Sequence, residues 1–105
     1  MGSESKFGPQ HHNAIAKDIR GEMEIHVNLR THHQRIGDGQ RMGRETYSID
    51  ALVKLALRLA FRFKADNDSF DPLKFLDQCS PDPDTMPLSE LWEGYDEERV
   101  GDGKD

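Results

Sequence analysis

Apolar positions recur at helical spacing through much of the chain. Ile15, Ile19 and Met23 are separated by four residues each, the repeat that places side chains on one face of an α-helix. Between Met23 and Leu29 apolar and polar residues alternate instead, which is typical of a β-strand. Because the chain offers no second alternating run to pair with it, we expect the helix to continue to about Thr31, with a strand as the alternative.

The stretch 30–46 is dominated by arginine, histidine and glycine. It contains Gly37-Asp38-Gly39, a combination typical of turns. We therefore predict a flexible basic loop over residues 30–46.

The most apolar helix is predicted to follow this loop. Ser48 suits the N-cap, and Asp50 would lie in the first turn, where the helix dipole favours an acidic side chain. The wide apolar face that follows indicates a central helix; it comprises Ile49, Leu52, Val53, Ala56, Leu59, Ala60 and Phe63. Only Lys54, Arg58 and Arg62 keep one stripe of this helix polar.

A third helix is marked by its first residues. Asp71 is a suitable N-cap, and Pro72 would occupy the first helical position, where a missing N–H does no harm. Phe70 and Phe75 are spaced to form a hydrophobic staple. We expect this helix to end at about Cys79, because two prolines follow within four residues.

Beyond these prolines, four apolar residues recur at the spacing i, i+3, i+4 and i+7: Leu88, Leu91, Trp92 and Tyr95. Such a face is the anchor pattern of a helix that binds in a partner's groove, and Trp and Tyr are enriched at binding hot spots. The alternative is that the segment folds back onto its own domain, where Trp92 would complete a small core. Both interpretations remain open at this point.

The predicted fold class is mostly α: a small bundle of about three helices, followed by a short amphipathic segment and an acidic tail. The expected boundaries are a disordered leader over 1–6 and a helical domain over 7–79. A proline-broken linker with the amphipathic segment covers 80–95, and a disordered acidic tail covers 96–105.

Composition and charge agree with one small domain. The 105 residues are 34% hydrophobic and 32% charged, with a net charge of −6. The charge is uneven, because residues 1–64 carry a net +4 and residues 65–105 a net −10. This asymmetry indicates a basic body and an acidic tail.

The expected location is the cytoplasm. No segment approaches the roughly 20 nearly unbroken apolar residues of a membrane span, and residues 1–10 lack the apolar run of a secretory signal. The single cysteine, Cys79, excludes an internal disulfide, which fits a reducing compartment.

Catalytic and cofactor chemistry finds little support. The five histidines do not occur at the H-x-x-x-H spacing common in zinc sites, and no glycine-rich loop follows a strand. Cys79 is surrounded by acidic residues, whereas a reactive thiol needs a basic neighbour. We therefore predict no catalytic residue, no cofactor and no bound metal.

Basic residues form the remaining candidate surface, one that would contact nucleic-acid phosphates: Arg30, Arg35, Arg41, Arg44, Lys54, Arg58 and Arg62. Nucleic-acid sites usually add exposed aromatic residues, whereas Phe61 and Phe63 beside this stripe are expected to be buried. The alternative is a solvated face whose long basic side chains cover apolar surface.

Two segments carry a resemblance to a known group of proteins. KFGPQHHNAIAKDIR (Lys6 to Arg20) and FKADNDSFDPLKFLDQCSPD (Phe63 to Asp82) resemble small uncharacterised proteins of tailed bacteriophages and prophages. The shared patterns are KF-x-x-x-H-x-x-A-I-A and ADN-x-x-FD-x-x-x-FL-x-x-C, over about a third of the chain. The resemblance implies an origin in a virus or mobile element and action in the infected cell's cytoplasm, without implying an activity.

Together these observations predict a non-enzymatic accessory or regulatory protein that acts by binding another protein, with no membrane association. The alternative is a nucleic-acid-associated accessory protein that uses the basic loop and the stripe of Lys54, Arg58 and Arg62. The sequence leaves the oligomeric state open.

Overall fold

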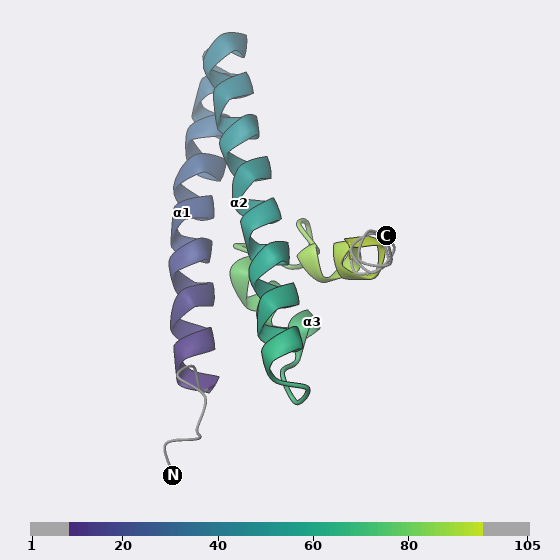
Figure 1. The fold of residues 1–105 in the computed structure, drawn as a ribbon. Helices are drawn as coiled ribbons and strands as arrows, with labels where there is room; N and C mark the ends of the chain where they lie inside the picture. The colour runs from purple at the N-terminus through teal and green to yellow at the C-terminus, as the bar shows by residue number, and fades with distance from the viewer. Residues whose placement is uncertain (1–8, 96–105) are drawn as a thin grey trace.

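The computed structural model describes residues 9–95, which are mostly helical (Figure 1). The elements are α1 (Pro9–Arg35), α2 (Gly39–Asp66), α3 (Pro72–Cys79) and the short 3-10 helix η1 (Leu88–Leu91). The mostly α fold class is confirmed. The predictions for residues 1–6 and 96–105 fall outside the described residues. No helix in the described part is long and apolar enough to span a bilayer.

The predicted loop over residues 30–46 is wrong, because α1 and α2 run through almost all of it. Only Ile36–Asp38 connect the two helices, which therefore form one long antiparallel hairpin (Figure 1). Gly37 has a φ of 74°, a left-handed conformation that favours glycine. Arginine, which occurs four times in this stretch, and glutamine, which occurs twice, are good helix formers once the turn is set.

The predicted start of α2 at Ser48 is also wrong. The N-cap is Asp38, whose carboxylate accepts a hydrogen bond from the Arg41 backbone N–H at 3.1 Å. Ser48 consequently lies inside α2 and caps nothing. Asp38 is both the last residue of the connection and the N-cap of α2. Because one residue serves both purposes, the connection can be short.

The alternating stretch 23–29 is helical, and α1 continues past Thr31 to Arg35. Met23 is fully buried, whereas Ile25 and Leu29 are 53% and 38% exposed. The alternation therefore arises from two separate faces of one helix, one buried and one exposed.

The hydrophobic core lies where the first half of α1, the second half of α2, α3 and η1 meet. Its buried members are Ala16, Ile19, Met23, Ala56, Leu57, Ala60, Phe70, Phe75, Leu76, Cys79 and Leu88. Leu88 belongs to this core although the predicted domain ended at residue 79. The segment 80–95 is therefore packed onto the bundle and contributes to it.

The predicted start of α3 is confirmed in detail. The Asp71 carboxylate accepts a hydrogen bond from the Lys74 backbone N–H at 3.2 Å, and Pro72 opens the helix. The rings of Phe70 and Phe75 lie with their centroids 5.6 Å apart, as the staple requires. These contacts fix the angle at which α3 leaves α2.

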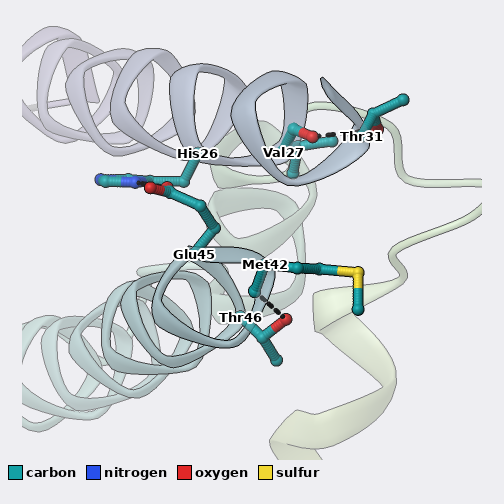
Figure 2. Close-up of polar contacts among 6 residues, drawn as sticks. All are labelled: His26, Val27, Thr31, Met42, Glu45 and Thr46. Atoms are coloured by element: carbon teal, nitrogen blue, oxygen red, sulfur yellow. Dashed lines mark hydrogen bonds and ion pairs between the residues drawn. The ribbon is translucent and has the colours of Figure 1, made fainter. Parts of the chain in front are cut away.

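The other end of the hairpin, residues 24–48, is named the arm here. It extends past α3 (Figure 1) and contributes no residue to the core cluster. A polar contact joins its two helices: His26 Nδ1 and Glu45 Oε2 lie 2.5 Å apart (Figure 2). The buried His33 Nδ1 has no hydrogen-bond partner in the described part of the chain.

We expect Asp71→Ala to lower the free energy of unfolding by about 1 kcal/mol, because it removes the N-cap of α3. Phe70→Ala should cost about 3 kcal/mol or more, because it also empties part of the core. Chemical denaturation followed by circular dichroism measures both. Asp77→Ala, an exposed site in the same helix, is the matched control, and an equal loss for Asp71→Ala and Asp77→Ala would contradict the assigned cap.

Candidate protein-binding groove

The structure divides the predicted partner-binding set. Leu88 is only 3% exposed and belongs to the core. Trp92 and Tyr95 are half-buried, with ring centroids 6.4 and 6.2 Å from that of Phe61. Leu91 alone is open to solvent, at 48%. The segment thus packs mainly on its own domain, and most of the proposed anchors are already occupied.

The division follows from local geometry. Residues 88–91 form a 3-10 helix, and an α-helical turn follows over 92–95. Side chains at i and i+3 eclipse in a 3-10 helix, so Leu88 and Leu91 lie on the same side of η1. Leu88 is covered by the core, whereas Leu91, one turn further along, lies beyond it and stays exposed. The change of helix type after Leu91 interrupts the single α-helical face predicted for the four residues.

The position of this segment is set by Ser80, a buried residue directly after α3. Its hydroxyl donates a hydrogen bond to the Met86 carbonyl at 2.7 Å and accepts one from the Asp82 backbone N–H at 3.2 Å. The Met86 N–H in turn donates to the Asp82 carbonyl at 2.7 Å. These bonds close the turn around the two prolines and hold Met86 beside the hairpin.

A groove of about 380 Å³ lies between this turn and the base of the arm. Its apolar lining combines two elements of the fold: Ile49 and Val53 of α2 with Met86, Pro87, Leu88 and Leu91. The polar lining residues are Arg30, Thr46, Asp50 and Glu90. Asp50 is paired with Lys54 at 3.2 Å.

The composition of the groove suits recognition. Its lining contains no histidine or cysteine, and one of its two acids, Asp50, is the partner of Lys54. An apolar floor with a few polar groups at the rim is typical of sites that take apolar side chains. The groove can accept one or two such side chains from another molecule.

The seven basic residues proposed for phosphate contact are not gathered on one surface. Arg30 is half-buried and lines the groove, and Arg41 at the turn lies 3.4 Å from the Asp38 carboxylate. Arg35 is exposed at the end of α1. The other four are all exposed along α2: Arg44, Lys54, Arg58 and Arg62.

A second hollow, of about 290 Å³, lies where the two segments of the phage resemblance meet. His12 from the first segment packs against the rings of Phe63 and Phe70, with centroids 4.4 and 4.8 Å away. Burial, and then the positive charge of His11, lower the pKa of His12 below 6.5. Asp71, which also lines the hollow, is engaged as the cap of α3.

Most motif residues of the resemblance therefore have structural roles. Ala16, Phe75, Leu76 and Cys79 are buried in the core, and Asn67 accepts a hydrogen bond from the Ser69 backbone N–H at 3.0 Å. Burial raises the pKa of the Cys79 thiol from 9.0 to about 12, which keeps it protonated. Within the described residues, no three His, Cys, Asp or Glu side chains are grouped to hold a metal.

Four exposed apolar residues of the arm were missed by the sequence analysis. Ile25, Ile36 and Tyr47 are 53%, 58% and 78% exposed, and Leu29 is 38% exposed. Helical phase would have indicated their exposure, but Ile36 lay in the predicted loop and the register of Ile25 and Leu29 was left open between helix and strand. The exposed apolar residues of the arm and the groove share one requirement, which is that α2 begins at Gly39. Tyr47 of the arm and Thr46 of the groove then belong to a helix.

Comparisons of the chain with protein-family models, curated proteins and solved structures found no match. The assignment of function therefore depends on the geometry described above.

We expect acidification to destabilise the fold through His12. Its pKa is lowered in the folded state, so between that value and 6.5 the unfolded chain binds more protons. Stability is then fully present above about pH 6.5 and decreases as the pH falls through this window. In His12→Gln the thermal midpoint should fall less between about pH 7.5 and about pH 5; an unchanged pH dependence would contradict the role of His12. His11→Gln removes only the smaller cause of the lowered pKa, so it should reduce the pH dependence in part.

Proposed function

We propose that this chain is a non-enzymatic accessory or regulatory protein that acts by binding another protein in the groove beside η1. The observation that carries this proposal is the half-exposed Leu91 beside the apolar part of the groove, which is lined by Ile49, Val53, Met86, Pro87 and Leu88. The partner presents one or two apolar side chains, such as Leu, Met or Phe, on a helix or short segment. The resemblance to phage and prophage proteins supports action in the cytoplasm of an infected cell.

The groove differs from the site expected from the sequence. Leu88 lines its floor from inside the core, whereas Trp92 and Tyr95 support the segment from the side of Phe61. The partner therefore inserts its side chains against Leu91, Met86 and Val53. In the arrangement expected from the sequence, a free amphipathic helix of this chain would instead insert into the partner. A preformed groove needs little ordering on binding, which favours affinity.

The groove is tested with two variants that change equally exposed leucines. Leu91→Asp puts a charge into the groove, whereas Leu73→Asp changes a residue of α3 that does not line it; the two leucines are 48% and 47% exposed. We expect a partner captured from producing cells to bind the wild type and Leu73→Asp, but Leu91→Asp about 30-fold more weakly, the equivalent of about 2 kcal/mol. Equal binding by both variants would exclude the groove.

Nucleic-acid binding remains a second candidate because of one feature of α2. Arg44, Lys54, Arg58 and Arg62 are exposed on α2, and Tyr47 recurs with them at intervals of three, seven and four residues, which keep them on the same side. Tyr47, 78% exposed, supplies an aromatic ring on which an unpaired base can stack. The overall charge of −6 opposes such binding.

If α2 binds single-stranded nucleic acid, affinity should fall steeply with added salt, because phosphate contacts release counterions. Arg44→Gln and Arg58→Gln should each reduce the salt slope by about 1, and Tyr47→Ala should weaken binding by about 1–3 kcal/mol without changing that slope. Fluorescence anisotropy with a labelled oligonucleotide measures both. An affinity that does not depend on salt would reject this candidate.

A further inference from the structure

The arm has an inverted distribution of polarity. The side of α1 that faces α2 is followed by residues spaced alternately by three and four: Ala16, Ile19, Met23, His26, Arg30 and His33, all buried or half-buried. The first three are apolar and lie in the core, but the last three are polar and lie in the arm. Of the large apolar side chains of the arm, Val27 and Met42 are half-buried, whereas Ile25, Leu29, Ile36 and Tyr47 are exposed.

This inversion matters for stability. A pair of helices normally buries its apolar residues between them, because removal of apolar surface from water is the main favourable term. In the arm most of that surface stays in water, while His33 is 8% exposed with an unpartnered Nδ1 within the described residues. An apolar helix face without cover is typical of an interface.

Three of these residues belong to a regular stripe along α1 and the turn. At spacings of four and three, it comprises Asp18, Glu22, Ile25, Leu29, His32 and Ile36, all exposed. Alternation of three and four is the repeat with which helices pack knobs into holes. At about 1.5 Å per residue, the stripe is about 27 Å long.

The stripe is complementary to itself when reversed. Its first two positions are acidic, its centre is apolar, and its far end carries His32 and Ile36 beside the exposed Arg35. Reversal about its centre places Ile25 opposite Leu29, Glu22 opposite His32, and Asp18 opposite Ile36. The acidic end of one copy then faces the basic end of the other.

We propose that the occupant of this face is a second copy of the chain, bound through an antiparallel contact of α1 with α1 around a two-fold axis near Val27. A two-fold contact uses the same surface on both copies, as the reversed stripe does. The interface is smaller than a standard one of about 1,600 Å², so the dimer dissociates on dilution. The contact leaves the groove beside η1 free and is independent of the proposed function.

Sedimentation velocity over a wide range of concentration measures the association. We expect a monomer–dimer equilibrium for the wild type and for Leu73→Asp, the control on α3. Leu29→Asp should raise the dissociation constant about a hundredfold, because the two-fold axis places the change in the interface twice. Circular dichroism should show unchanged helix content, since Leu29 is exposed; Leu29→Gln repeats the test with a neutral side chain.

The orientation is tested by charge reversal. His32→Glu places a carboxylate opposite Glu22 of the other copy, so it should weaken the dimer about tenfold. Adding Glu22→Lys to the same chain should restore the dimer, since residues 22 and 32 meet only between copies. A monomer at every concentration, or a dimer that Leu29→Asp and Leu29→Gln leave intact, would overturn the proposal; failure of the restoration would overturn the antiparallel pairing.

Discussion

The fold depends on close contact between the first half of α1 and the second half of α2. Ala16, Ala56 and Ala60 are all fully buried there, and side chains this small allow helices to approach closely. On this pair of helices α3 adds Phe75 and Leu76, and the last segment adds Leu88. Because the core lies at one end of the hairpin, the arm at the other end is held together mainly by the contact between its own two helices.

Local signals in the sequence were sufficient for the elements that cap and pack locally. Asp71, Pro72, Phe70 and Phe75 specify the start of α3 through residues adjacent in the chain. The apolar face of α2 likewise predicted its central place. Such features are accessible from sequence because each cause lies within a few residues of its effect.

The predicted loop and the predicted C-terminal face were wrong for one reason. Both were inferred from residue composition and spacing within one segment, without its contacts to distant segments. Glycine and arginine in residues 30–46 indicated a loop, but Asp38 and Gly37 confine the turn to three residues. The C-terminal segment was expected to present one α-helical face, whereas η1 is a 3-10 helix and Leu88 is buried by contacts with the distant elements of the core. The groove depends on both, since Thr46 and Ile49 must be helical and Met86 must be held beside them by Ser80. Contacts between distant segments of this kind leave no periodic signal in the chain.

The Ser80 hydroxyl also joins the last turn of α3 to the wall of the groove. Opening of this junction would release Met86 and expose the end of α3 together, so the two events form one local unfolding equilibrium. A molecule bound in the groove then shifts that equilibrium toward the closed state in proportion to its concentration and affinity. The protection of α3 backbone amides from exchange with solvent would consequently report occupancy of a site that α3 does not itself line.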